Sequence, residues 1–254
     1  MSATDGELLA IAVEAARSGA AVLMDRYSRA PEEVHTKSSP TDPVSEADLT
    51  AEREIREVLA RRRPDDAVLG EEGTDVAGTS ALRWLVDPLD GTVNYLYRFP
   101  QWCVSIACVD HAAVVLDPVH DELFTAVAGG PACLDGVPLR RRGADSLATA
   151  LVATGFGYDA HVRAAQAAVA ERVLPRVRDI RRAGSAALDL AWTAAGRCDA
   201  YYERGVKPWD VAAGAMLCRA AGLVVRDLPE RDGLPAGLLA APPAIADDLL
   251  ALVA

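Results

Sequence analysis

The stretch WLVDPLDGT, residues 84–92, sets an apolar run directly before two aspartates that lie three positions apart. Pro88 restricts one backbone φ angle and Gly91 permits a tight turn, so the carboxylates of Asp87 and Asp90 can converge on one point. An Asp-Gly pair alone is more typical of simple turn chemistry. The second aspartate, the following threonine and the preceding strand together favour a metal site.

The residues after Gly91 are compatible with a short helix that reaches Phe99 and Pro100. Backbone N–H groups at a helix start have no partner within the helix, and they favour an anion such as phosphate. The sequence therefore predicts a metal site and a phosphate site next to each other.

Further acidic residues stand at the ends of apolar runs or at the starts of helices. Glu71 closes the short apolar run 67–69, although paired glutamates are more often part of a solvated turn. Asp210 precedes an apolar helix, where its alternative role is that of an N-cap. Asp48 stands three residues after Ser45, and a capping box would explain it equally well. These acids are candidates for the same site as Asp87.

Composition describes an acidic globular protein. The 254 residues carry 26 Lys and Arg against 37 Asp and Glu, a formal charge of −11, and 51% are hydrophobic. One core can serve a chain of about 250–300 residues, so a single domain is expected. The excess of acid argues against binding to the phosphate backbone of nucleic acid and fits a protein that attracts cations.

Several other classes are disfavoured by residue spacing. No apolar stretch approaches the roughly 18 residues of a membrane span, and the amino terminus is acidic where a signal peptide is basic. We therefore expect no membrane association and a cytoplasmic location. The five cysteines are odd in number and lack a CxxC pair, so we interpret them as reduced core residues. The four histidines lack metal-site spacing, and no serine stands in a GxSxG setting.

Periodicity predicts two helices followed by an antiparallel-looking sheet in the first half of the chain, and alternating strands and helices in the second half. Thr4 and Glu7 form a candidate capping box for the first helix, which extends to about Tyr27, and a second helix starts at Ser45. The expected strands cover residues 67–69, 82–86, 102–109, 112–116, 123–128, 151–154, 177–180, 200–203, 223–226 and 237–240. The later helices cover residues 160–174, 186–195 and 211–221, with a terminal helix after Pro243. A polar stretch, residues 140–146, divides the two halves, and neither half looks able to stand alone.

Four motifs, in order, resemble those of the inositol monophosphatase family, and the resemblance spans residues 8–254. WLVDPLDGTVNYLYRFP, residues 84–100, is similar to the signature WxxDPxDGTxNFxxxxP. KPWDVAAGAMLCRAAGLVV, residues 207–225, resembles the second signature, a WDxAAG followed by an apolar helix. PVSEAD and LGEEG, residues 43–48 and 69–73, match the two remaining acidic segments. The resemblance implies a mixed α/β fold, a layered α–β–α–β–α sandwich, in one domain, residues 1–254. Its metal and phosphate lobe would cover about 1–143 and its substrate lobe about 144–254.

The resemblance also implies the site. Two or three Mg2+ ions are expected, and oxygen ligands of this kind suit Mg2+. The first ion would be held by Glu71, Asp87, the Leu89 carbonyl and Thr92, the second by Asp87, Asp90 and Asp210, and a weaker third by Glu71 through water. As catalytic residues beside Glu71, Asp48 and Thr92 would orient and deprotonate the attacking water, while the N–H groups of Gly91 and Thr92 would bind phosphate. The hydroxyl contacts of the substrate would be Asp90, Gly184, Ser185, Ala186 and Glu203.

The resemblance therefore implies a Mg2+-dependent phosphomonoesterase that acts on inositol 1-phosphate. The carboxylate of Glu203 suits vicinal hydroxyls and sits poorly beside a second phosphate, although an acid on the surface of an edge strand would explain it as well. Fructose 1,6-bisphosphate, histidinol phosphate and 3′-phosphoadenosine nucleotides are alternative substrates for the same chemistry. A regulatory protein-binding role on a retained fold is the alternative of another class. The resemblance further implies inhibition by Li+ and a homodimer.

Overall fold

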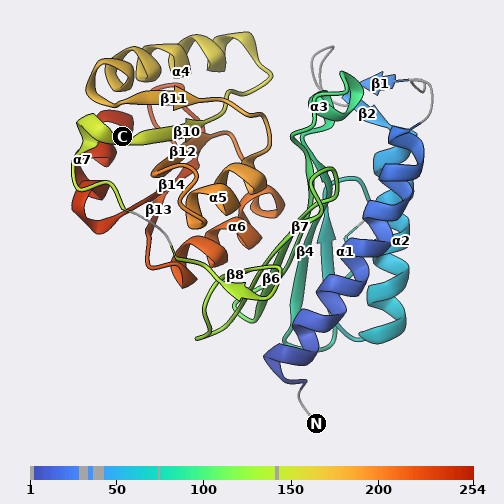
Figure 1. The fold of residues 1–254 in the computed structure, drawn as a ribbon. Coiled ribbons are helices and arrows are strands. Elements are labelled where there is room, and N and C mark those ends of the chain that lie inside the picture. Colours follow the sequence, from blue (N-terminus) through green and yellow to red (C-terminus); the bar gives the residue numbers. More distant parts are fainter. Residues whose placement is uncertain (1–2, 29–33, 37–42, 74, 141–142) are drawn as a thin grey trace.

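The structure is a computed structural model that describes residues 3–28, 34–36, 43–73, 75–140 and 143–254, with backbone alone at 34–36 and 43–45. Its two main sheets and their helices form five layers (Figure 1). Helices α1 (Asp5–Tyr27) and α2 (Glu46–Arg62) cover the outer face of a seven-stranded sheet, and α5 (Ala186–Ala194) and α6 (Pro208–Ala220) lie between the sheets. Helices α4 (Ala160–Val173) and α7 (Pro243–Val253) cover the far face of a five-stranded sheet. This is the mixed α/β, α–β–α–β–α sandwich that the sequence predicts.

The seven-stranded sheet has the order β3-β4-β5-β6-β7-β8-β9. Its strands are β3 (Ala67–Gly70), β4 (Arg83–Asp90), β5 (Cys103–Cys108), β6 (Ala112–Asp117), β7 (Glu122–Val127), β8 (Cys133–Leu134) and β9 (Val137–Pro138). All neighbours pair antiparallel except β3 and β4, which run parallel. The expected antiparallel-looking sheet is thus found, except at this edge, where the pairing is parallel. Periodicity also missed β8 and β9, because two-residue strands are too short to show an alternation.

The five-stranded sheet is mixed and has the order β11-β10-β12-β14-β13. Its strands are β10 (Leu151–Thr154), β11 (Asp179–Arg181), β12 (Ala200–Arg204), β13 (Val224–Leu228) and β14 (Gly237–Ala241). The remaining elements are β1 (Val34–Thr36), β2 (Pro43–Ser45), α3 (Thr92–Leu96) and two 3-10 turns, Leu147–Thr149 and Leu174–Arg176. The polar stretch 140–146 lies between the two sheets in the chain, and its residues 141 and 142 are outside the described residues.

Strand β4 is longer than the sequence predicts. The expected strand ends at Val86, whereas β4 continues to Asp90 and pairs with β5 across a register shift between Asp87 and Asp90. Proline cannot donate a hydrogen bond to a sheet and is tolerated at such irregularities, so Pro88 fits inside the bulge. The two aspartates thus belong to a strand that bends at its end.

Alternation along the strands divides the buried residues into three cores. Trp84 and Val86 of β4 pack with α1 and α2 on one face of the seven-stranded sheet. The opposite face of that sheet packs with α5, α6 and one face of the five-stranded sheet, so both halves of the chain contribute to this middle core. The third core joins the other face of the five-stranded sheet to α4 and α7.

The expected start of the first helix is confirmed. The capping box of α1 is present, with the Thr4 side chain accepting from the Glu7 N–H and the Glu7 carboxylate accepting from the Thr4 N–H. All five cysteines are free, and four of them are buried. Among the described residues, no helix is both long enough and apolar enough to cross a membrane.

The close contact between α5 and α6 depends on Gly214. A Cβ atom at this position would lie 2.5 Å from Cβ of Leu190, which is fully buried in α5. We expect Gly214→Ala to lower the free energy of unfolding by about 1–3 kcal/mol, because overpacking outweighs the gain in helix propensity. Gly6→Ala is the matched control, since nothing lies within 4 Å of the added carbon and α1 should become about 0.5–1 kcal/mol more stable. Urea unfolding monitored by circular dichroism measures both, and equal effects of the two changes would contradict this packing.

Candidate active site

The candidate site forms where β4 bends, and residues from other parts of the chain lie beside it. Asp87 lies in the buried end of β4 with its side chain 1% exposed, and its Oδ1 accepts a hydrogen bond from the Leu89 N–H at 3.0 Å. The Glu71 N–H donates to the Val86 carbonyl at 3.2 Å, because β3 runs parallel to β4 and ends beside it. The carboxyl of Asp87 also forms a hydrogen bond with that of Glu71. The structure therefore brings these two predicted ligands together.

The side chains of Asp48 and Thr92 are in contact next to the bend of β4. The Thr92 hydroxyl oxygen lies 3.1 Å from Oδ1 of Asp48 and 3.2 Å from the Leu89 carbonyl oxygen. Asp48 is completely buried in the first turn of α2, and Thr92 is the first residue of α3. The contact of Asp48 with Thr92 joins two positions 44 residues apart, which a capping role for Asp48 alone does not require.

Gly91 connects β4 to α3 in a conformation that suits glycine. Its φ angle of 101° is left-handed, and an added Cβ would lie 3.0 Å from the Gln101 carbonyl oxygen. A residue with a side chain would be strained there. This turn places the backbone of Gly91 and Thr92 directly after Asp90.

Asp90 links the two halves of the chain. Its Oδ2 accepts hydrogen bonds from the Ser185 hydroxyl at 2.7 Å and from the Ala187 N–H at 2.6 Å. Ser185 is also the N-cap of α5, so the carboxylate lies at the start of this helix, where negative charge is favoured. The predicted contacts Ser185 and Ala186 are thus next to Asp90, and Gly184 precedes them with a φ angle of 98°.

Asp210 occupies a different helix position from the one expected. We predicted a helix that begins at Val211, with N-capping as an alternative role for Asp210, but α6 begins at Pro208 and its N-cap is Lys207. The predicted start was too late because proline is favoured in the first turn of a helix. The Asp210 Oδ2 accepts a hydrogen bond from the Lys207 N–H at 2.7 Å.

Glu203 does not lie on an edge strand, so the alternative explanation of this residue is wrong. It belongs to β12, which pairs with β10 on one side and β14 on the other. Its Oε2 accepts a hydrogen bond from the Tyr201 hydroxyl at 3.1 Å. A Cβ on Gly155 would lie 2.0 Å from Glu203 Oε1, so glycine at 155 makes room for the carboxylate.

Burial and mutual repulsion raise the pKa values of the acids. Loss of solvation, followed by the negative charges of Glu71, Asp90 and Asp210, raises the pKa of Asp87 well above its usual range. Loss of solvation and the charge of Asp90 do the same for the pKa of Asp210. Burial raises the pKa of Asp90 to about 6, although the hydrogen bonds from Ser185 and Ala187 oppose the rise. The group is thus a concentration of acid that a cation would stabilise.

The donor chemistry of these residues fits a divalent cation. Carboxylate, hydroxyl and carbonyl oxygens are the ligands that Mg2+ prefers. Among the described residues, no group of three or more His, Cys, Asp or Glu side chains is placed so that it could hold a metal ion as it stands. Asp90 and Asp210 instead accept hydrogen bonds from N–H donors of α5 and of the residue before α6.

Two side chains of the site were missed by sequence reasoning. The Asn94 side chain donates to the Gln101 and Ala183 carbonyls at 2.6 and 2.8 Å, and so joins α3 to the segment before α5. Asp189 is 1% exposed, and the loss of solvation and the charges of Glu203 and Asp90 raise its pKa well above the usual range. An acid inside the apolar helix sequence AALDLAWTA is a signal that could have identified Asp189.

The chain matches the model of the inositol monophosphatase family over residues 5–254. It is 46% identical over 232 residues to inositol-1-monophosphatase of Mycobacterium bovis, a match that covers 86% of this chain and 80% of the relative. It is 45% identical over 228 residues to a protein of Xylella fastidiosa called Nus factor SuhB, with 87% of this chain and 82% of the relative covered.

Solved structures show the same fold. The extragenic suppressor protein suhB from Bartonella henselae superimposes with a TM-score of 0.89 at 33% identity, covering 97% of this chain and 98% of the other. Mycobacterium tuberculosis SuhB superimposes with a TM-score of 0.83 at 39% identity, covering 99% and 97%.

The stability of the protein without metal should depend on pH through Glu203. Burial and the charge of Asp90 raise its pKa from 4.5 to about 7, so the folded state binds this proton more tightly than the unfolded chain. Ionisation of Glu203 therefore lowers stability as the pH rises from about 4.5 through 7, and the loss persists above 7. We expect Glu203→Gln to raise Tm more at pH 8 than at pH 5, since Gln keeps an acceptor for Tyr201 and carries no charge. Calorimetry in EDTA at the two pH values measures this, and an equal shift at both would contradict it.

Proposed function

Because the chain belongs to the inositol monophosphatase family, and so to a family of phosphatases, we propose that it is a Mg2+-dependent phosphomonoesterase that hydrolyses inositol 1-phosphate. The observation that carries the proposal is the set of acids gathered at the bend of β4 from β3, β4 and α6. Glu203 belongs to the same electrostatic neighbourhood, because its negative charge raises the pKa of Asp210. The metal-binding acids and an acid suited to hydroxyl groups thus stand close together.

We propose that two or three Mg2+ ions bind at this end of the sandwich, held by Glu71, Asp87, the Leu89 carbonyl, Thr92, Asp90 and Asp210. When bound, Mg2+ supplies positive charge that lowers the pKa of a water molecule and stabilises a leaving alkoxide. The raised pKa values of Asp87, Asp90 and Asp210 support this assignment, because ionised carboxylates at these positions need a neighbouring positive charge.

Asp48 and Thr92 are the proposed pair that handles the proton of the attacking water. The hydroxyl of Thr92 lies within hydrogen-bond distance of Asp48 Oδ1. It can therefore accept a hydrogen bond from water while its own proton points to the Asp48 carboxylate. Because Asp48 is fully buried, its orientation toward Thr92 is defined by packing.

The remaining residues orient the substrate. In the proposal, the backbone N–H groups of Gly91 and Thr92 bind the phosphate. The left-handed turn at Gly91 places these two N–H groups directly after Asp90. Glu203, Asp90 and the Gly184–Ala186 segment contact hydroxyl groups of the cyclitol. The hydrogen bonds of Asp90 to Ser185 and Ala187 hold the phosphate side and the hydroxyl side in one arrangement.

Related phosphate monoesters are the alternatives for the same machinery. Fructose 1,6-bisphosphate carries a second phosphate, which a half-buried acid such as Glu203 disfavours. Histidinol phosphate and 3′-phosphoadenosine nucleotides lack the ring of vicinal hydroxyls that a carboxylate binds well. We further propose that Li+ inhibits the protein, that it forms a homodimer, and that it is located in the cytoplasm.

A regulatory role is the second candidate function, and one observation favours it. Relatives with nearly the same identity to this chain carry two different names, inositol-1-monophosphatase and Nus factor SuhB. The chain could therefore bind another macromolecule while it keeps the fold. The full set of predicted acidic ligands favours catalysis over a purely non-catalytic role.

Loss of the acid that both proposed metal sites share should abolish catalysis. Asp87→Asn keeps the size of the side chain and removes its charge, so we expect phosphate release with Mg2+ and inositol 1-phosphate to fall by more than about 100-fold, beyond the usual effect of changes to residues around a metal ligand. Asp248→Asn, an exposed position on α7, is the matched control and should retain full activity. Turnover near that of the unchanged protein in Asp87→Asn would refute the proposed metal site.

A substrate panel tests the assignment of Glu203. We expect inositol 1-phosphate to be hydrolysed faster than histidinol phosphate or 3′-phosphoadenosine nucleotides. Glu203→Ala should lower kcat/KM for inositol 1-phosphate by about 10- to 100-fold, the effect of losing a hydrogen bond to a charged group. The same variant should hydrolyse p-nitrophenyl phosphate, which has no hydroxyl groups for Glu203, at the original rate. The reverse ranking of natural substrates would overturn the proposed specificity.

A further inference from the structure

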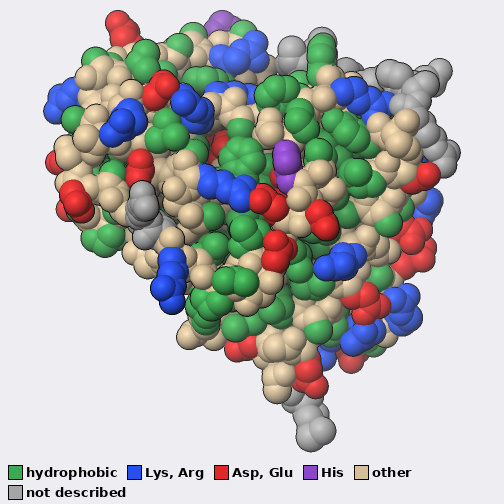
Figure 2. All heavy atoms as spheres, in the orientation of Figure 1, with side chains coloured by type: hydrophobic (Ala, Val, Ile, Leu, Met, Phe, Trp, Pro, Cys, Tyr) green, Lys and Arg blue, Asp and Glu red, His purple; other side chains and the backbone are tan. Residues whose placement is uncertain are grey.

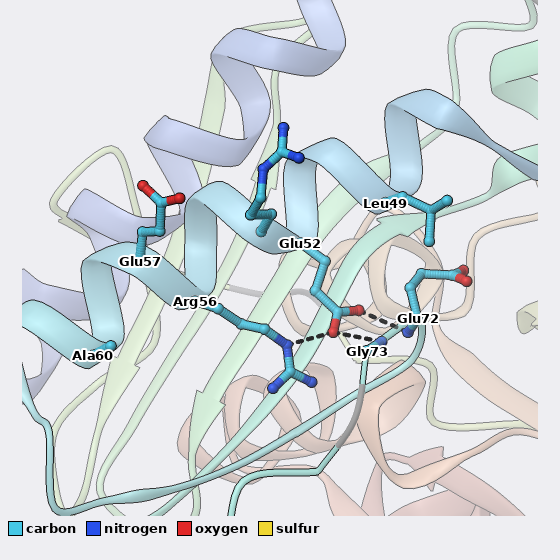
Figure 3. Close-up of a pocket in the computed structure, with 8 residues that line it drawn as sticks. Leu49, Glu52, Arg56, Glu57, Ala60, Glu72 and Gly73 are labelled. Atoms are coloured by element: carbon cyan, nitrogen blue, oxygen red, sulfur yellow. Dashed lines mark hydrogen bonds and ion pairs between the residues drawn. The ribbon is translucent and has the colours of Figure 1, made fainter.

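Glu52 is a buried acid of α2 that the proposed mechanism does not use. It stands one turn after Asp48 in the helix and is 2% exposed. Figure 3 shows its side chain leaving α2 toward Glu72 and Gly73, in the segment that follows β3. This segment, Glu71–Gly73, is named here the post-β3 turn.

The carboxylate of Glu52 binds the backbone of the post-β3 turn. Oε2 accepts a hydrogen bond from the Glu72 N–H at 2.7 Å, and Oε1 accepts one from the Gly73 N–H at 2.8 Å (Figure 3). Arg56, one helical turn away, donates its Nε–H to Oε1 at 2.6 Å and balances the charge. Each carboxylate oxygen therefore accepts a hydrogen bond from one N–H of the turn, and this pair of hydrogen bonds is called the clasp below.

The glycines on either side of the two glutamates leave room for this clasp. A Cβ at Gly70 would lie 2.5 Å from Glu52 Oε1, and a Cβ at Gly73 would lie at the same distance from the same atom. Contacts this short force something to move, and here the carboxylate is restrained by three hydrogen bonds. The glycines at both ends of the sequence GEEG thus leave the space that the Glu52 carboxylate occupies.

Packing gives the post-β3 turn little other support on this side. A hollow of about 340 Å³ lies beside it, bordered by Leu49 and Arg53 of α2 as well as by Glu72 and Gly73. Side chains at the edge of a hollow have fewer packing partners than those in a core. The hydrogen bonds to Glu52 therefore contribute to the orientation of the turn.

We propose that Glu52 is a positioning residue for the metal site, which acts by orienting Glu71. The clasp holds the two N–H groups immediately after Glu71, while the Glu71 N–H is held by the Val86 carbonyl. The backbone of Glu71 is thus fixed on both sides, and its carboxylate is directed to Asp87. The inference rests on the proposed function, since it assumes that Glu71 is a metal ligand.

Thermal stability in a Mg2+ titration tests the role of Glu52 without an activity assay. A ligand that binds the folded state raises its stability by RT ln(1 + [L]/Kd), so a fit of Tm against Mg2+ concentration gives the apparent Kd, which is the half-saturating concentration and is called the Mg2+ midpoint below. In Glu52→Gln, one carboxylate oxygen is replaced by an NH2 group, which cannot accept a hydrogen bond from a backbone N–H. We expect the half-saturating Mg2+ concentration to rise by about 10- to 100-fold, as for other residues that orient metal ligands. Activity should recover at high Mg2+, because no ligand is removed.

A double-mutant cycle separates positioning from general stability. If Glu52 acts through Glu71, Glu52→Gln should have little further effect on the Mg2+ midpoint in a Glu71→Gln background. If the fold-change in the Mg2+ midpoint of the double variant equals the product of the fold-changes of the two single variants, the proposal is overturned. Glu57→Gln is the matched control, because Glu57 lines the same hollow from the same helix and makes no hydrogen bond or ion pair within the described part of the chain. It should leave the midpoint unchanged.

A second variant covers the case in which Glu52→Gln does not fold. Gly73→Ala disturbs the clasp from the other side and should raise the Mg2+ midpoint in the same direction. A folded Glu52→Gln, or failing that Gly73→Ala, with the original midpoint would overturn the role of Glu52. No Mg2+-dependent rise of Tm in the unchanged protein would instead contradict the proposed function, so the two failures are distinguishable.

Discussion

Repulsion among carboxylates that are wholly or partly removed from water is the constraint on which the rest of this structure depends. Glu71, Asp87, Asp90 and Asp210 lie near one end of the sandwich, and removing such groups from water is costly when they are ionised. The fold offsets part of this cost with N–H donors, because Asp90 lies at the start of α5 and Asp210 in the first turn of α6. Cations would offset the remainder, which is why the site and the stability of the protein should be coupled to metal and to pH.

The five-layer arrangement explains how acids from distant parts of the chain come together. The ends of β3 and β4, at the parallel edge of the first sheet, present Glu71 and Asp87, while α5 and α6 lie between the sheets and begin near Asp90 and Asp210. Residues of both sheets pack on these two helices in the middle core. On the face shown in Figure 2, acidic and basic side chains are interspersed with hydrophobic and uncharged ones. The net charge of −11 is thus only partly a property of the site.

Support for the site comes from residues that contribute no reactive side chain. Gly91 permits the left-handed turn, Gly155 makes room for Glu203, and Asn94 joins α3 to the segment before α5. In our proposal Glu52 belongs to this group, since it restrains the turn that carries Glu71. Such residues give a catalytic site its geometry and are harder to recognise than the ligands, because their own sequence signals are weak.

The sequence by itself determined the class of fold and the candidate ligands, because the acids stand in ordered motifs next to glycines, prolines and apolar runs. It also located most helices and strands, since burial on one face imposes a period that can be read from local residues. Only the tertiary structure decided that β4 continues through its bulge to Asp90, that Glu203 lies on a central strand, and that Glu52 clasps the turn after Glu71. These features arise from pairings between segments far apart in the chain, and local periodicity contains no information about which distant segment a residue will meet.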